Sequence, residues 1–319
     1  LIEDNVEAGL GLSSGDALVE HTVIRRIPPV NEHGSNGILL SQAPMAPPGT
    51  LVVRHSLIEH APYGIAVMAG QATIEGTLLR DLLRPAGVTG GAGVTATGGA
   101  PSTLTVTGTL IERAQQAGVF ASRGAVTLDR VTIRDVLASP DFGVGEGVQV
   151  VRNGTLTLRR SLVSGCRGVG VFMGDGAALI ESSIVRGVAA RSDSGDFGAG
   201  IAAQSVNGRS SLVIRNVWID DAHVAGLQIN GASLDLLGAL ITRVHAQPID
   251  GLYGDGIAVQ SAVRDTGAFV LGEATLRGLV VRDVPRAGVG VFGASVSLGD
   301  SLIGCSAFPI ALAERFSSR

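Results

Sequence analysis

The chain has 319 residues, a net charge of −4, a hydrophobic content of 45% and 46 glycines. This hydrophobic content excludes a disordered chain, the acidic balance argues against nucleic acid as a partner, and no apolar run is long enough to span a membrane. All 24 basic residues are arginine. No charged-then-apolar leader is visible, and Leu1-Ile2-Glu3-Asp4 reads as the middle of a repeat, so we expect a segment of a longer chain.

One short motif, a small residue followed by two apolar residues and a polar one, recurs along the chain, as in Ser56-Leu57-Ile58-Glu59. Its second apolar residue, termed the anchor, occurs twelve times. The anchors are Ile2, Ile24, Ile58, Leu79, Ile111, Ile133, Val163, Val185, Ile219, Ile241, Val281 and Ile303. Their spacings alternate strictly between short units of 21 or 22 residues and long units of 30 to 40 residues.

A second motif, Gly-apolar-x-apolar, follows the anchor, as in Gly64-Ile65-Ala66-Val67. Short strands separated by glycine turns in a unit of 22 residues predict one coil of a parallel β-helix, with coils stacked about 4.8 Å apart. The scarcity of helix formers and the apolar period of two exclude helical repeats, and no fixed Asn and Leu frame indicates leucine-rich repeats. We therefore expect one all-β domain over residues 1–319, a solenoid of twelve coils alternating short and long.

Both motifs, Gly-Ile-Ala-Val and Ser-Leu-Ile-Glu, resemble the strands of the right-handed parallel β-helix superfamily, the pectin-lyase-like fold. The resemblance covers essentially the whole chain and implies a single-stranded, right-handed parallel β-helix. It does not imply one function, because the superfamily includes lyases, glycosidases, epimerases, phage tailspikes, adhesins and non-catalytic surface proteins. The chain resembles the non-catalytic surface-protein type most.

Charged residues beside the anchor alternate in sign from coil to coil. One position after the anchor, successive coils have Glu3, Arg25, Glu59, Arg80, Glu112 and Arg134. Stacked in register, this order pairs opposite charges across coils, at about 0.2–1 kcal/mol each. We expect separations below about 6 Å for pairs such as Glu59–Arg80 and Glu112–Arg134. The structural repeat is then a pair of coils, and most charged residues have a structural explanation.

Two outward positions of the Gly-apolar strand carry no charge in any coil. Such a face is typical of a contact surface, and its aromatic residues favour a partner, either another protein subunit or a polysaccharide. The alternative is a face covered by the chain's own long loops. We expect Phe120→Asp to weaken the contact without unfolding the charge ladder. The predicted binding-face residues are Leu39, Phe120, Gln149, Phe172, Gln228 and Phe292.

Acidic residues outside the ladders stand in the long coils, just before the Gly-apolar strand. Asp141 and Glu146, like Asp250 and Asp255, lie six and one residues before the strand glycine, where Asn31 and Asn36 stand in an earlier coil. Loops of alternate coils lie about 9.6 Å apart, near the upper end of the carboxylate separation of an inverting glycosidase. The alternative is ordinary Asp-Gly turn chemistry, in which the aspartate caps its own backbone.

Aspartates beside glycines and backbone carbonyls also suit Ca²⁺. The residues considered for this role are Asp193, Asp196, Asp250 and Asp255. His21 and His55 share a column on adjacent coils with His60 nearby, which is consistent with a metal pair, although a side-chain stack is the simpler expectation. Cys166 and Cys305 are five coils apart, about 24 Å, too far for a disulfide, and Cys166 is expected to be a buried thiol.

The resemblance implies two chemistries: Ca²⁺-assisted proton abstraction by Arg or Lys in pectate-lyase-like members, and paired aspartates with a histidine in polygalacturonase-like members. Gly254-Asp255-Gly256 and Asp220-Asp221 match these patterns only in part, since no Gly-His-Gly, Arg-Ile-Lys or any lysine is present. We therefore predict a non-catalytic extracellular rod without a cofactor, acting as a structural or binding surface. The alternative is a polysaccharide-active enzyme, a lyase or glycoside hydrolase, that uses Asp141, Glu146, Asp250 and Asp255.

Two structural expectations remain. Short coils are expected to be plain three-strand rungs, and long coils to bulge at two places. A β-helix exposes unpaired strand edges at its ends, and the tail at residues 311–316 is short for a cap. We hypothesise that the native chain is longer at the N-terminus, or that another subunit covers the open coil.

Overall fold

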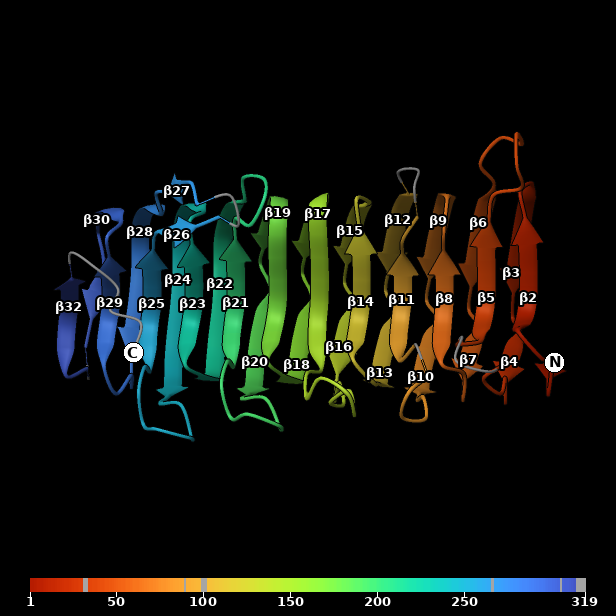
Figure 1. Ribbon diagram of the computed structural model, residues 1–319, viewed down its shortest axis with the longest axis horizontal. Helices are drawn as coiled ribbons and strands as arrows, with labels where there is room; N and C mark the ends of the chain where they lie inside the picture. Colours follow the sequence, from red (N-terminus) through yellow and green to blue (C-terminus); the bar gives the residue numbers. More distant parts are fainter. Residues whose placement is uncertain (31–33, 89, 99–101, 265–266, 305, 314–319) are drawn as a thin grey trace.

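The computed structural model describes residues 1–30, 34–88, 90–98, 102–264, 267–304 and 306–313. Within these residues the chain forms strands and turns, and it contains no helix that is long and apolar enough to cross a membrane. Thirty strands join in one parallel sheet that winds round an axis, so the predicted parallel β-helix is confirmed. Figure 1 shows the resulting rod, with β2 and β32 near opposite ends. Asn31, Cys305 and tail residues 314–316 lie outside the described residues.

Each coil contributes strands to three faces, termed the first, second and third face. The first face carries the Gly-apolar motif and consists of β2 (Ala8–Ser13), β5 (Asn36–Ser41), β8 (Tyr63–Val67), β11 (Ala92–Ala96), β14 (Ala117–Ser122), β21 (Ala199–Gln204), β23 (Ala225–Asn230), β25 (Asp255–Gln260), β29 (Ala287–Phe292) and β32 (Phe308–Ala313). The second face consists of β3 (Asp16–Glu20), β6 (Thr50–Arg54), β9 (Gly70–Glu75), β12 (Ser102–Thr107), β15 (Ala125–Asp129) and β30 (Ser295–Gly299).

The third face carries the anchors and consists of β1 (Ile2–Glu3), β4 (Val23–Arg25), β7 (Leu57–Glu59), β10 (Leu78–Leu82), β13 (Leu110–Ala114), β16 (Thr132–Arg134), β18 (Leu162–Arg167), β20 (Ile184–Ala189) and β31 (Leu302–Ile303). Five longer strands turn the corner between two faces. Two of them, β17 (Glu146–Arg159) and β19 (Val169–Glu181), join the first face to the second. The other three, β22 (Ser211–His223), β24 (Ser233–His245) and β28 (Glu273–Arg282), join the second face to the third.

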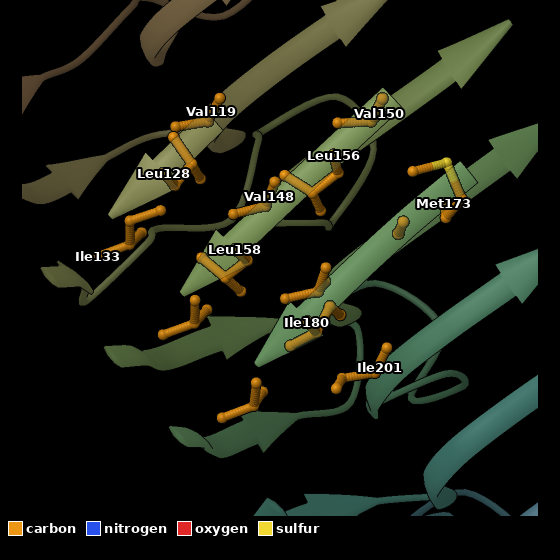
Figure 2. Close-up of a cluster of buried hydrophobic side chains, with 14 of the residues drawn as sticks. Val119, Leu128, Ile133, Val148, Val150, Leu156, Leu158, Met173, Ile180 and Ile201 are labelled. Atoms are coloured by element: carbon orange, nitrogen blue, oxygen red, sulfur yellow. The ribbon is translucent and has the colours of Figure 1, made fainter. Parts of the chain in front are cut away.

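The predicted anchors set the register of the rod. Anchors of successive coils are paired residues throughout, as in Ile58 with Leu79 and Ile111 with Ile133. Side chains from all three faces meet in one core: Val119 from the first, Leu128 from the second and Ile133 from the third are fully buried. Figure 2 shows these side chains pointing into the same interior. The alternation of inward and outward residues on each strand therefore places one charged or polar position beside each buried one.

A column of glycines on the first face is required by close packing. A Cβ built on Gly118 would lie 2.4 Å from Ile133 Cγ2 and 2.6 Å from the carbonyl oxygen of Gly147 on the next coil. The same two contacts, with the following anchor and with the next coil's backbone, recur along the rod. The glycines concerned are Gly9, Gly37, Gly64, Gly93, Gly118, Gly147, Gly170, Gly200, Gly226, Gly256 and Gly288. No side chain fits this column because first and third faces converge there.

The predicted charge ladder is confirmed. Arg80 Nε lies 2.8 Å from Glu59 Oε2, and Arg134 Nε lies 2.9 Å from Glu112 Oε2. The two glutamate side chains are only 8% and 7% exposed, whereas the arginines lie over them at 38% and 49% exposure. Each guanidinium therefore covers the carboxylate of the coil before it.

The extra residues of the long coils lie outside the main sheet. In the coil that ends at Val281 they form a loop before β25 and a hairpin after it, and the hairpin strands β26 (Ala262–Val263) and β27 (Phe269–Val270) pair only with each other, antiparallel. The coil that ends at Val163 also departs from a plain rung at two places. Most of its extra residues precede β17, and one further residue produces a register shift between Val151 and Gly154 where β17 passes through the next corner.

We predict that Gly118→Ala destabilises the protein by about 1–3 kcal/mol, because the added methyl group overpacks a contact made partly of backbone. Urea unfolding followed by circular dichroism measures the difference. Gly11→Ala is the matched control, since a Cβ there would meet nothing within 4 Å, and its effect is expected to stay within about 0.5 kcal/mol. Equal losses for the two variants would contradict the packing explanation.

Candidate functional site

The outward side of the first face forms the predicted uncharged surface. Its first column pairs Thr95 with Phe120, Phe120 with Gln149, Gln149 with Phe172, Phe172 with Ala202, Ala202 with Gln228, Gln228 with Ala258 and Ala258 with Gly290. Leu39 continues this column in β5, and Phe292 lies in the second column beside Gln260. The six residues predicted as a binding face therefore share one face of the rod. We term these two columns the uncharged face.

The phenylalanines of the uncharged face lie against small neighbours. The ring of Phe172 packs on Val169, Ala199 and Ala202, and a Cβ on Gly174 would touch it at 3.0 Å. The ring of Phe292 lies in the same way beside Gly290, at 2.9 Å from an added Cβ. Both rings are half-buried. Small residues thus let the aromatic rings lie along the sheet, which leaves a broad and shallow surface.

A buried ion pair lies at the edge of this surface. Asp255 is fully buried, and its carboxylate accepts hydrogen bonds from Arg286 Nε at 2.7 Å, from Arg286 Nη2 and from the Ala287 N–H at 3.3 Å. The Arg286 guanidinium carbon is 5.2 Å from the Tyr253 ring centroid and 5.4 Å from that of Phe292. A small depression on the uncharged face is lined by Tyr253, Asp255, Arg286 and Phe292, together with Gln228 and Gln260. The buried pair fixes the guanidinium between two aromatic rings.

The sequence suggested that Glu146 and Asp255 lie in loops. In the structure they are instead the first residues of β17 and β25. They occupy the column directly before the strand glycine, where Ala117 and Ala287 stand in neighbouring coils. Asp255 in this column borders the uncharged face, where it lines the depression with Gln228 and Gln260. Because four coils separate the two carboxylates, they lie about 19 Å apart on strand spacing and do not act on one bond.

Glu146 is the second of these two acids, and burial changes the pKa of its carboxyl group. Burial raises its pKa to about 7, and the positive charge of Arg191 opposes this shift only in part. Among the described residues, no hydrogen bond to its carboxylate is found, and the backbone N–H donates to Gln116. A carboxyl group of this kind holds its proton near neutral pH, which suits a proton donor.

The other two loop acids have structural roles. Asp141 Oδ2 lies 2.6 Å from Nη2 of the buried Arg84, so the pair joins loops of two different long coils. Asp250 is exposed, and its Oδ1 accepts the N–H of Leu252 at 2.9 Å. Asp250 therefore follows the Asx-turn alternative, and within the described chain neither residue forms a hydrogen bond or ion pair with Glu146 or Asp255.

The four aspartates considered as Ca²⁺ ligands do not converge. Asp193 and Asp196 lie 2.7 and 3.5 Å from the guanidinium of Arg191, and Asp255 binds Arg286. Over the described ranges, no group of three or more His, Cys, Asp or Glu side chains is placed to hold a metal ion. Three of the four aspartates thus pair with arginine, and Asp250 accepts the N–H of Leu252.

The histidines form stacks. His21 and His55 have ring centroids 5.5 Å apart, as a stacked pair, and His60 lies separately, 4.0 Å from Glu59. A second pair, His223 and His245 at 5.0 Å, was not identified from the sequence. Its signal was present, because the two residues are register partners on adjacent coils.

Sequence reasoning also missed Arg286 and Tyr253. Each occurs at its position in one coil only, so neither produces a repeating column. The sequence did contain a signal for this pair. Ala287 is the residue expected to pair with Asp255 of the preceding coil, and Arg286 directly precedes Ala287. A search for opposite charges offset by one residue between adjacent coils would have found the pair.

Comparison with known proteins supports the fold assignment. No protein-family model matches the chain, and no curated protein matches it. Among solved structures, the A-module of a mannuronan C-5 epimerase from Azotobacter vinelandii is similar at a TM-score of 0.59 and 11% identity, over 93% of this chain and 88% of that one. A periplasmic alginate epimerase is similar at 0.57 and 11% identity, over 86% of this chain and 69% of that one.

The Dettilon tailspike protein is similar at a TM-score of 0.50 and 15% identity, over 96% of this chain and 62% of that one. At these identities the likeness concerns the fold alone. The protein therefore has the fold of a right-handed parallel β-helix, as its repeat motifs predict.

We predict that Asp255→Asn destabilises the protein by about 3–5 kcal/mol, because it leaves a half-buried guanidinium without its counter-charge. Thermal and urea unfolding measure this loss. Asp250→Asn, in an exposed turn, is the control and is expected to cost less than about 1 kcal/mol. A loss for Asp255→Asn no larger than the control's would show that the buried pair contributes little.

We predict that the stability gained by Glu146→Gln grows with pH. The pKa of Glu146 in the folded protein, about 7, lies above its ordinary value of 4.5, so the unfolded chain releases this proton first as the pH rises. The stabilising contribution of the protonated group is therefore complete below pH 4.5 and is lost as the pH rises through 7. Urea unfolding of wild type and variant between pH 4.5 and 8 measures the effect. A difference that is constant over this range would contradict it.

Proposed function

We propose that this protein is a non-catalytic polysaccharide-binding rod whose uncharged face is the ligand surface. The observation that carries the proposal is the unbroken pair of charge-free outward columns, which contain Phe120 and the rings of Phe172 and Phe292 lying along the sheet. Flat rings pack against the C–H faces of sugars, and the amides of Gln149 and Gln228 both donate and accept hydrogen bonds, as sugar hydroxyls require.

The shape of the face suits a linear polymer. Its columns repeat at about 4.8 Å along the rod, so equivalent contacts continue from coil to coil. The depression around Tyr253, Arg286 and Phe292 is too small for a whole ligand but offers two rings and a fixed guanidinium at one edge. The names of the similar structures, which include alginate and mannuronan epimerases, support a polysaccharide as the partner.

The absence of catalysis is inferred from the separation of the acids. Glu146 and Asp255 stand four coils apart on the face, Asp141 binds Arg84, and Asp250 caps its own turn. General acid–base cleavage of a glycosidic bond needs two carboxyl groups within about 10 Å. In this proposal the acids hold the loops and the arginines in place.

A polysaccharide-active enzyme is the second candidate, and Glu146 is the residue that favours it. Glu146 is the first residue of β17, and burial raises the pKa of its carboxyl group to about 7. Release of reducing sugars or unsaturated products that disappears in Glu146→Gln would establish this function in place of the first. Ca²⁺ remains an untested prediction and has no role in the binding proposal.

We also infer an extracellular or cell-surface location. It follows from the proposed ligand, since long polysaccharides are typical of cell surfaces, and from the names of a periplasmic epimerase and a tailspike protein among similar structures. A further protein subunit as partner is the remaining alternative for the same face. Its contact would be detected as a change in mass in solution.

We predict that Phe172→Ala weakens polysaccharide binding about tenfold, because a ring contact of ~1.4 kcal/mol is lost at the centre of the face. Affinity electrophoresis or calorimetry against a panel of acidic and neutral glycans provides the measurement. Leu18→Ala is the control, since Leu18 is 60% exposed on the second face. A wild-type protein that binds no glycan, or equal effects of both variants, would rule out the uncharged face as the ligand surface.

A further inference from the structure

Two arginines stand at the far edge of the uncharged face, at a left-handed corner of the chain where the Arg123 N–H donates to the Val151 carbonyl at 3.1 Å. Arg123 and Arg152 have φ angles of 63° and 57°, in the left-handed region that side chains with a Cβ adopt at an energetic cost. They follow directly after the second outward column, a position where other coils have glycine, as at Gly98, Gly231 and Gly293. Glycine would therefore adopt this corner conformation at a lower energetic cost than arginine.

The other arginines with positive φ have a carboxylate partner, which Arg123 and Arg152 lack among the described residues. There are seven such arginines in the described chain. Five of them, Arg26, Arg113, Arg130, Arg160 and Arg243, lie within 4 Å of a carboxylate oxygen. Arg123 and Arg152 have no ion pair with any described residue. Strained residues without a structural partner are characteristic of ligand contacts.

Arg123 and Arg152 are also neighbours. Their preceding residues, Ser122 and Val151, are register partners, so the two like charges stand on adjacent coils about 4.8 Å apart along the rod. Both are exposed, and both line one cavity of about 390 Å³ with Phe120, Ser122 and Thr97. Phe120 and Ser122 belong to the uncharged face, so this cavity is its continuation.

The nearest acid on the next coil does not neutralise them. Asp175 is buried, and its two carboxylate oxygens accept the N–H groups of Val206 at 2.7 Å and Asn207 at 3.0 Å. The loop that these bonds hold leans back toward the pair, since a Cβ on Gly208 would lie 2.8 Å from Asn153 Oδ1. The carboxylate of Asp175 therefore holds in place the loop that lies beside the two arginines.

The same edge continues to a second cavity. Arg264 Nη2 donates to the Gly208 carbonyl at 2.7 Å, which joins the β26–β27 hairpin to the loop that approaches Asn153. Arg209 and Arg264 line a cavity of about 720 Å³ with Ser211, Ser233 and a single acid, Glu273. The charged residues lining the two cavities are thus four arginines and one glutamate.

We infer that Arg123 and Arg152 form an oxyanion-binding site for an acidic polysaccharide, with Arg209 and Arg264 extending it along the rod. Guanidinium groups bind carboxylate and sulfate groups through paired N–H donors, and a polymer with regularly spaced anions engages several at once. This inference rests on the proposed function, because the site borders the uncharged face and shares Phe120 with it. The neutral sugar rings lie on the face, and their anionic groups lie at this edge.

The test measures binding of polygalacturonate, dextran sulfate and uncharged dextran at several salt concentrations. The double variant Arg123→Gln/Arg152→Gln is expected to bind the acidic polymers at least about tenfold more weakly, because hydrogen bonds to charged groups are lost. Its affinity is also expected to depend less on salt. Arg186→Gln/Arg282→Gln is the matched control, two exposed arginines of the third face that have no ion pair with any described residue. Thermal melting verifies that each variant is folded.

The outcomes separate the two proposals. Preference for polygalacturonate or for dextran sulfate identifies carboxylate or sulfate as the recognised group. Equal binding of dextran and acidic polymers, unchanged in the double variant but reduced in Phe172→Ala, would overturn the anion site and keep the uncharged face. Equal binding of single-stranded DNA would overturn the assignment to a glycan. No binding of any polymer would reject the proposed function together with this site.

Discussion

The contact between the strand glycine and the following anchor is the constraint on which the rest of the rod depends. At each coil the first and third faces come so close that a Cβ at Gly226, for example, would lie 2.5 Å from Ile241 Cγ2. This closeness fixes the cross-section and the register of the first face. It also explains why the residue before the glycine is usually alanine: the backbone on either side has little freedom to move outward. Everything on the uncharged face is positioned by this internal contact.

A second constraint follows from parallel, in-register stacking, which places equivalent residues of successive coils side by side. Like charges would then repel one another, and the arginines offset this repulsion through their planar shape as well as their charge. Arg113 binds Asp81 through both Nε and Nη2, at 2.6 and 2.8 Å, and Arg160 binds Asp129 in the same way. Lysine, with a single ammonium group, cannot form this two-point contact across coils. The exclusive use of arginine is consistent with a structure whose outer ladders depend on such forks.

Repetition determined what the sequence alone could predict. Anchors, glycines, the Glu59–Arg80 type of ladder and the uncharged columns recur in many coils, so their register followed from spacing. Glu146 and Asp255 were assigned to loops because each replaces the alanine of a repeating column only once. Arg84 and Asp141 are 57 residues apart and join two long loops that follow no repeat. Loop contacts depend on the path of each insertion, and periodicity carries no information about that path.

The two-coil repeat has a consequence for how such a rod changes length. Removing the segment from one anchor to the second anchor after it, for instance from Ile58 to Ile111, would join coils of matching type. The junction would keep both the glycine–anchor contact and the alternation of acid and arginine. Loss of one coil would instead set glutamate beside glutamate. Duplication and deletion in the history of this chain are therefore tolerated in whole pairs, and each step moves the sites on either side by about 9.6 Å without turning them to another face.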